Sequence, residues 1–201
     1  MNVALCGTHG IGKTTLLQDV WSRLASTDPE GWLGTKLTEQ ARSVAAALEL
    51  HSLADVPLWS QQQREYFQWR VMMNQVAAEH QAVLEHGGFL SDRSVVDNLS
   101  YIMYYRCSQT MINAIKAFCM SHVEHYDILF YMPIPVQFNV DALHDGFRME
   151  QLESVVAVDE IMLGLFEDIG ESTNIVTLSA DRNAWVDEVC EEIDIFSLTS
   201  V

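Results

Sequence analysis

Basic side chains are scarce in this sequence of 201 residues. Lys and Arg together number 11 against 28 Asp and Glu, which gives a formal net charge of -17. A surface this acidic repels phosphate polymers, so nucleic-acid binding would require a local group of basic side chains. The composition therefore argues against a general nucleic-acid-binding protein.

Cysteine is also rare, and long apolar runs are missing. The four cysteines lie far apart and form no C-x-x-C pair, so we expect reduced thiols rather than a zinc site or a disulfide scaffold. No apolar stretch approaches the roughly 18 residues that a membrane span requires, and no cleavable signal precedes the first expected strand. These absences predict a soluble, cytoplasmic protein that does not bind membranes.

Repeats, low-complexity tracts and linkers are absent as well. A length of 201 residues suits one α/β domain, and a hydrophobic content of 49% is enough for a packed core. We therefore expect a single domain over residues 1–201.

A phosphate-binding motif stands near the amino terminus. Residues 7–14 read G-T-H-G-I-G-K-T and match G-x-x-x-x-G-K-[ST] at every fixed position. Such glycines let a loop turn its N–H groups inward around a triphosphate, Lys13 would reach the β- and γ-phosphates, and Thr14 would ligate Mg²⁺. The residues predicted to bind the nucleotide are Gly7, Thr8, His9, Gly10, Ile11, Gly12, Lys13, Thr14 and Thr15.

Strand and helix patterns alternate along the chain. Short apolar runs predict strands at 3–6, 32–37, 89–92, 127–132 and 174–178. Apolar residues at helical spacing predict helices at 13–24, 38–50, 58–85, 95–120 with a break at 106–108, 149–166 and 184–196. This alternation predicts a P-loop NTPase α/β fold: a parallel sheet of about five strands flanked by helices on both faces, with the site at the carboxyl ends of the strands.

Asp92 and Arg93 directly follow the third expected strand. Because the carboxyl ends of parallel strands meet at one edge of a sheet, we expect Asp92 beside the P-loop. Its carboxylate would hold Mg²⁺ or take a proton from the acceptor, and Arg93 would clamp the acceptor. The alternative is an ordinary helix N-cap with an exposed arginine.

Glu39 and Arg42 follow the second expected strand and lie three residues apart, on one side of a helix start. Glu39 would act as a base or bind an acceptor hydroxyl, and Arg42 would bind a charged group of the acceptor. An intrahelical ion pair of little energetic value is the alternative.

A polar segment, Asp145-Gly146-Phe147-Arg148, lies within a predicted lid at about 139–160. Arg148 would swing over the γ-phosphate and neutralise charge in the transition state. A turn with a solvated side chain is the alternative.

Amide and aromatic side chains are concentrated in residues 61–70, which read Q-Q-Q-R-E-Y-F-Q-W-R. Such groups suit the binding of a base, and Gln63 and Arg64 are the polar candidates for binding the acceptor; a packed core stripe is the alternative for most of this segment. Arg182, at the start of the last helix, is a candidate for stacking on adenine, and a capping or surface arginine is its alternative.

Four segments in this order resemble the small P-loop kinases of nucleosides and nucleotides: 7–14, 38–42 (T-E-Q-A-R), 91–99 (S-D-R-S-V-V-D-N-L) and 145–148 (D-G-F-R). The resemblance spans residues 1 to about 185. It is strongest to the ribosylnicotinamide-kinase type and to the thymidylate-kinase-like group, which includes phage enzymes that phosphorylate hydroxymethyluracil in DNA. It implies ATP with Mg²⁺ as the donor, with Lys13, Thr14 and Asp92 in the phosphate and metal roles and Arg148 in the lid.

The sequence departs from these relatives at two places. Their lids usually carry a second arginine near the position of Val155 or Val156, so charge stabilisation here would rest on Arg148. Thymidylate kinases have an aromatic residue after the Asp-Arg pair and a Glu-Pro-Gly-Gly stretch after the second strand, whereas this chain has Ser94 and Glu39-Gln40-Ala41. These differences argue against simple thymidylate kinase activity.

The sequence thus predicts transfer of a γ-phosphate from ATP to a hydroxyl of a nucleoside-type acceptor. That acceptor would be a free nucleoside, a nucleotide or a modified base in DNA, and the acidic composition favours a small molecule, with DNA entering only as a substrate. Because a P-loop alone leaves the reaction open, two alternatives remain: an ATPase or nucleotide-dependent switch acting on a protein partner, and a binding module without catalysis. The sequence carries no indication of the oligomeric state.

Overall fold

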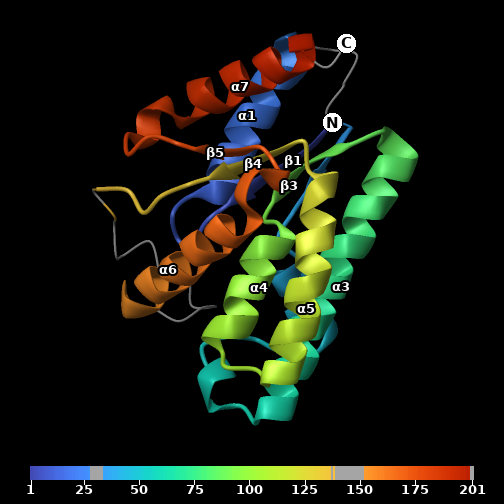
Figure 1. The fold of residues 1–201 in the computed structure, drawn as a ribbon, viewed down its shortest axis with the longest axis vertical. Coiled ribbons are helices and arrows are strands. Elements are labelled where there is room, and N and C mark those ends of the chain that lie inside the picture. Colours follow the sequence, from blue (N-terminus) through green and yellow to red (C-terminus); the bar gives the residue numbers. More distant parts are fainter. Residues whose placement is uncertain (28–33, 137, 139–151, 200–201) are drawn as a thin grey trace.

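A five-stranded parallel sheet forms the centre of the molecule (Figure 1). The computed structural model describes residues 1–27, 34–136, 138 and 152–199. The strands are β1 (Asn2–Cys6), β2 (Thr35–Leu37), β3 (Phe89–Asp92), β4 (Ile128–Tyr131) and β5 (Ile175–Thr177). Their order is β2-β3-β1-β4-β5, and each neighbouring pair is parallel. The predicted sheet is therefore confirmed.

Helices cover both faces of this sheet (Figure 1). One face is covered by α1 (Lys13–Thr27) and α7 (Trp185–Thr199), and the other by α3 (Gln61–His86), α4 (Val95–Tyr104), α5 (Gln109–His122) and α6 (Leu152–Ile169). A shorter helix, α2 (Gln40–Ala47), packs on α3. Short 3₁₀ turns lie at Val56–Leu58, Val123–His125, Gly170–Ser172 and Arg182–Ala184.

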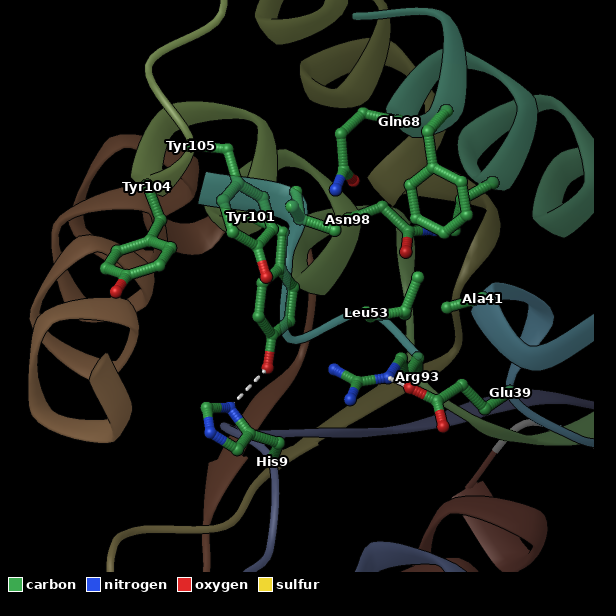
Figure 2. A pocket seen from close by; sticks show the side chains of 13 residues that line it. His9, Glu39, Ala41, Leu53, Gln68, Arg93, Asn98, Tyr101, Tyr104 and Tyr105 are labelled. Atoms are coloured by element: carbon green, nitrogen blue, oxygen red, sulfur yellow. Dashed lines mark hydrogen bonds and ion pairs between the residues drawn. The ribbon is translucent and has the colours of Figure 1, made fainter. Parts of the chain in front are cut away.

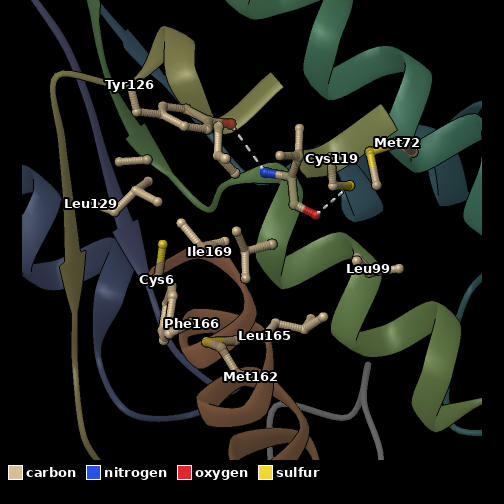
Figure 3. Close-up of a cluster of buried hydrophobic side chains, with 14 of the residues drawn as sticks. Cys6, Met72, Leu99, Cys119, Tyr126, Leu129, Met162, Leu165, Phe166 and Ile169 are labelled. Carbon is tan, nitrogen blue, oxygen red and sulfur yellow. Dashed lines mark hydrogen bonds between the residues drawn. The ribbon is translucent and has the colours of Figure 1, made fainter. Parts of the chain in front are cut away.

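Two hydrophobic cores lie on opposite faces of the sheet because side chains alternate along a strand. In β1, Val3 and Leu5 pack against α1 and α7, whereas Ala4 and Cys6 face the helices on the other side. Figure 3 shows this second core, in which Cys6 and Leu129 of the sheet contact side chains of α4 and α6. The sheet is thus buried on both faces, as its near-continuous apolar strands require.

The helix predicted over 95–120 is broken where the sequence indicates. α4 ends at Tyr104 and α5 begins at Gln109. Between them Arg106 has a φ of 52°, a left-handed conformation that ends helices. The Ser108 hydroxyl then accepts a hydrogen bond from the Met111 N–H and caps α5.

The central position of β1 places the P-loop at the middle of the carboxyl edge. Leu5 pairs with Asp92 of β3, and Cys6 pairs with Tyr131 of β4, so residues that follow these strands meet around the P-loop.

All four cysteines are buried and unpaired, which confirms that they form no disulfide. Within the described ranges, the helices include none that is long and apolar enough to cross a membrane.

Candidate active site

The P-loop connects β1 to the first residue of α1, Lys13. Its glycines have positive φ angles of 152°, 78° and 103° at Gly7, Gly10 and Gly12, which L side chains rarely adopt. A Cβ atom on Gly7 would lie 2.4 Å from the Cδ1 atom of Ile11, so the close approach also requires glycine. The loop therefore folds tightly over the N-terminus of α1, where backbone N–H groups and the helix dipole attract anions.

Lys13 is directed back into the loop that precedes it. Its Nζ atom donates hydrogen bonds of 2.6 Å to the carbonyl oxygens of Gly7 and Thr8, and the residue is only 5% exposed. The loop thus holds the ammonium group at the base of the cavity in which the motif predicts the phosphates.

Asp92 lies where the strand pairing predicts it. The Thr14 hydroxyl donates a hydrogen bond to the Asp92 carboxylate, which brings together the two oxygen-bearing groups expected to bind Mg²⁺. Hydroxyl and carboxylate oxygens are ligands that Mg²⁺ prefers, so this pair fits a magnesium ion bound to a nucleotide.

Arg93 and Glu39 form a buried ion pair across the ends of β3 and β2. The Nε atom of Arg93 donates a hydrogen bond of 2.8 Å to Glu39 Oε1, and both side chains are less than a tenth exposed. Burial by itself lowers the pKa of the Arg93 guanidinium, but nearby carboxylates, led by that of Glu39, raise the pKa above its ordinary value. Arg93 therefore stays charged, and the exposed arginine considered as an alternative is wrong.

Asp97 connects this ion pair to the P-loop. Its carboxylate lies 3.5 Å from Arg93 Nη1 and accepts a hydrogen bond of 3.1 Å from the Gly7 N–H. It also closes a capping box with Ser94 at the start of α4. The N-cap alternative considered for the Asp-Arg-Ser segment is thus partly correct, since Ser94 caps the helix while Asp92 and Arg93 face the site.

Two cavities meet at Glu39 and Arg93. The first, which we call the phosphate cavity, is lined by Gly12, Lys13, Thr14, Asp92 and Arg182. The second, the acceptor cavity, lies among α2, α3 and α4 (Figure 2). Because Glu39 and Arg93 line both, they stand in the wall between the two spaces.

The acceptor cavity combines aromatic rings with two amide groups. Gln68 of α3 and Asn98 of α4 point into it near Tyr101 (Figure 2), and the buried Nδ2 atom of Asn98 has no hydrogen-bond partner in the described part of the chain. A hydrogen bond of 2.9 Å joins Tyr101 Oη to His9 Nδ1. This bond links the cavity to the P-loop. Aromatic rings and an unsatisfied amide are groups that bind a planar heterocycle.

Gln68 and Asn98 were missed by the sequence reasoning, which selected Gln63 and Arg64 instead. Neither Gln63 nor Arg64 lines the acceptor cavity or the phosphate cavity. Gln63 is exposed and closes the capping box of α3 with Ser60, and Arg64 donates a hydrogen bond of 2.6 Å to the Trp59 carbonyl oxygen. A signal for Gln68 was present, because Gln68, Met72, Gln75 and Glu79 recur at helical spacing and place polar residues on a buried stripe.

Arg42 lies beside the site without lining either cavity. Its Nε atom is 3.6 Å from Glu39 Oε2, and its side chain is half exposed. The ion pair considered as an alternative is therefore present, and binding of the acceptor by Arg42 stays a prediction.

Arg182 packs against the P-loop. A Cβ atom on Gly12 would lie 2.5 Å from Arg182 Nη2, so the guanidinium lies beside the phosphate cavity; stacking on adenine stays a prediction. Arg148 and residues 139–151 of the predicted lid are outside the described residues, and residues 152–160 form the first part of α6.

Solved structures share this fold. Deoxyadenosine kinase from M. mycoides, with dCMP and dCDP bound, has a TM-score of 0.69 and 14% identity over 96% of this chain and 99% of its own. NadR in complex with NAD and AMP-PNP has a TM-score of 0.63 and 20% identity. A second structure of NadR, in complex with NR, has a TM-score of 0.64 and 20% identity. This chain spans about half the length of NadR, 48% and 50% in the two structures. These similarities confirm the predicted fold of small P-loop nucleoside kinases.

The comparison with curated protein sequences gave no significant match. The family of the chain is nevertheless established by its sequence, since the AAA domain profile matches residues 2–192. That range includes the P-loop, the buried Glu39–Arg93 pair and every strand of the sheet. The chain therefore belongs to this AAA domain family.

Proposed function

We propose that this protein transfers the γ-phosphate of ATP to a hydroxyl group of a nucleoside-type acceptor. The observation that carries this proposal is the position of Glu39 and Arg93 in the wall shared by the phosphate and acceptor cavities. Phosphoryl transfer requires an acceptor oxygen in line with the γ-phosphate, and the meeting point of two cavities allows that alignment. The fold shared with deoxyadenosine kinase and NadR supports the same function.

On the donor side, the P-loop N–H groups and Lys13 would bind the β- and γ-phosphates, and Thr14 and Asp92 would hold Mg²⁺, which supplies charge neutralisation when bound. Arg182 adds a positive charge at the edge of the same cavity. Arg148 remains the proposed lid residue.

On the acceptor side, Glu39 would accept the proton of the attacking hydroxyl. The hydroxyl oxygen forms a bond to the γ-phosphorus, the bond from that phosphorus to the β–γ bridging oxygen breaks, and ADP leaves with the electron pair. Arg93, held by Glu39, would neutralise charge on the transferred group.

The charges of the acceptor cavity favour a neutral acceptor. Among the described residues, Arg93 is the only lysine or arginine that lines it, and two carboxylates, Glu39 and Asp97, already lie within 3.5 Å of its guanidinium. A nucleoside monophosphate would bring two further negative charges, and the described residues that line this cavity offer no second lysine or arginine to match them. We therefore propose a free nucleoside ahead of a nucleotide or of a hydroxymethylpyrimidine such as 5-hydroxymethyluracil in DNA.

Transfer from γ-labelled ATP tests this proposal. Separate reactions would contain free nucleosides and ribosylnicotinamide, nucleoside monophosphates, and DNA with 5-hydroxymethyluracil. We expect label on a neutral nucleoside, with kcat lowered about 10²- to 10⁴-fold by Glu39→Gln and abolished by Lys13→Ala, while circular dichroism stays unchanged. Label on the monophosphates or on DNA alone would reject the neutral acceptor.

The same reactions distinguish the alternative of an ATPase or switch. That function predicts release of inorganic phosphate without any acceptor, stimulated by a protein partner. Wild-type activity in Lys13→Ala would contradict both nucleotide-dependent functions.

A further inference from the structure

The main chain at Arg93 has a conformation that needs external support. Its φ angle is 114°, which is strained for a residue with a side chain. The Arg93 carbonyl oxygen accepts two buried hydrogen bonds, one of 2.7 Å from Ser91 Oγ and one of 3.2 Å from Gln75 Nε2. These two donors hold the peptide group at the point where the Arg93 side chain turns toward Glu39.

The orientation of the Gln75 amide is set by Glu79, one turn further along α3. The Gln75 Nε2 atom lies within hydrogen-bond distance of three acceptors: Glu79 Oε1 at 2.7 Å, Ser91 Oγ at 3.0 Å and the Arg93 carbonyl oxygen at 3.2 Å. A carboxylate oxygen accepts a hydrogen bond from an amide N–H, so Glu79 turns the amide nitrogen of Gln75, rather than its oxygen, toward Arg93.

Glu79 is itself held by donors from two other elements. It is only 2% exposed and accepts hydrogen bonds of 2.7 Å from Tyr126 Oη and from His122 Nε2. The Tyr126 hydroxyl also accepts a hydrogen bond from the Val95 N–H at the start of α4 (Figure 3). The buried carboxylate is therefore satisfied, and the network connects α3, α4 and the end of α5 to the Arg93 backbone.

We infer that Gln75 and Glu79 are positioning residues for phosphotransfer: acting through the Arg93 carbonyl, they hold the Arg93 guanidinium on Glu39 in the wall between the two cavities. The inference rests on the proposed function for the role of Arg93. What holds Arg93 is independent of that function, since it depends only on the hydrogen bonds described above. Without these donors the strained backbone relaxes, and the guanidinium loses its place beside Glu39.

Exchange of the Arg93 Nε–H proton tests the positioning without any need for activity. This proton is buried and bonded to Glu39, so its ¹H–¹⁵N signal, assigned by its loss in Arg93→Lys, should exchange slowly with water. Gln75→Leu and Ser91→Ala each remove one donor to the Arg93 carbonyl oxygen and should speed exchange at least about tenfold.

Thr173→Val is the matched control. It removes a buried hydroxyl that donates a hydrogen bond of 2.9 Å to the Val123 carbonyl oxygen, and this hydroxyl makes no hydrogen bond to Glu79, Gln75 or Arg93. Its Arg93 signal should exchange as in the wild type. Wild-type protection in both Gln75→Leu and Ser91→Ala would overturn the inference.

Steady-state kinetics provide the second measurement. In Gln75→Leu and Ser91→Ala we expect kcat to fall about 10- to 100-fold with the KM for ATP changed less than about twofold, and Thr173→Val should retain its kcat. A double variant, Gln75→Glu with Glu79→Gln, exchanges the two side chains. It keeps one donor and one acceptor between positions 75 and 79 but offers no amide N–H to the Arg93 carbonyl oxygen, so its kcat should stay low.

A wild-type kcat in this double variant would show that the two residues only pack the core, and would reject the inference. A wild-type protein that phosphorylates no acceptor would reject the proposed function alone, because the exchange measurement still decides the positioning. An active wild type whose Arg93 signal is insensitive to both single variants would reject the positioning alone.

Discussion

At the scale of single residues, Asp92 shows how strand register places a carboxylate beside the P-loop. It pairs with Leu5 and accepts a hydrogen bond from Thr14. Asp92→Asn preserves the shape and an acceptor oxygen but removes the negative charge that would hold Mg²⁺. We expect kcat to fall about 10²-fold or more, with ATP affinity nearly unchanged and the Mg²⁺ concentration for half-maximal rate raised. Titration of the rate with Mg²⁺ measures this, and an unchanged rate would remove Asp92 from the mechanism.

Cys107 provides a residue-scale prediction about pH. Burial raises the pKa of its thiol to about 11 from an ordinary value near 9. The unfolded thiol therefore loses its proton at a lower pH than the folded one, so this contribution to stability is complete below pH 9 and is lost as pH rises through 11. The free energy of unfolding should fall by up to about 1.4 kcal/mol for each unit by which the folded and unfolded pKa values differ.

Urea denaturation at pH 8, 9, 10 and 11 checks this expectation. Cys107→Ala should be less stable at pH 8 because it leaves a small cavity, yet its free energy of unfolding should fall less over the alkaline range than that of the wild type. Parallel curves for the two proteins would contradict the shifted pKa.

At the scale of elements, α3 carries two glutamines with different roles on adjacent turns. Gln63 caps the helix and is exposed, whereas Gln68 is 4% exposed and lines the acceptor cavity. Gln63→Ala should lower the free energy of unfolding by roughly 1 kcal/mol through loss of the capping box and leave the KM for the acceptor unchanged. Gln68→Leu should raise that KM about tenfold or more.

Denaturation curves and acceptor KM values for these two variants measure the contrast, each serving as the control for the other. A raised KM in Gln63→Ala would restore the role that the sequence first indicated for it. An unchanged KM in Gln68→Leu would remove this side chain from acceptor binding.

At the scale of the whole molecule, the net charge of -17 is the dominant electrostatic property. Self-repulsion at this charge opposes the compact state, and salt screens it. We expect Tm at neutral pH to rise by a few degrees between low salt and about 0.2 M NaCl, and to rise less near pH 5, where some carboxylates are protonated. Differential scanning calorimetry measures both. A Tm that falls with salt would show that surface pairs such as Lys116–Asp168 outweigh the repulsion.

Much of this organisation could be predicted from the sequence because it depends on local patterns. The P-loop is contiguous, and its chemistry requires glycines, Lys13 and Thr14 at fixed spacing. The strands read as buried apolar runs, and the break near Arg106 interrupts the helical spacing. Asp92 was placed correctly since parallel strands bring their carboxyl ends to one edge.

The acceptor cavity was predicted poorly because it is assembled from distant segments. Gln63 and Gln68 are both glutamines on the same helix, and only the packing of α2 and α4 against α3 decides that Gln68 is the one enclosed. Likewise, Asn98 carries no local signal, and the spacing of Gln75 indicates only that it is buried, because the contacts of both residues come from other elements.

The sequence by itself determined that the chain folds into a P-loop α/β domain with a nucleotide-binding loop at its amino end, because periodicity and motif spacing are local and specific. Only the tertiary structure decided that Glu39 bonds to Arg93, that this pair lies between two cavities, and that Glu79 contacts Gln75, which bonds to the Arg93 backbone. Such hydrogen bonds between different segments, of 2.7–3.2 Å, join residues 18 to 54 positions apart. They depend on how the elements pack, which no local pattern specifies.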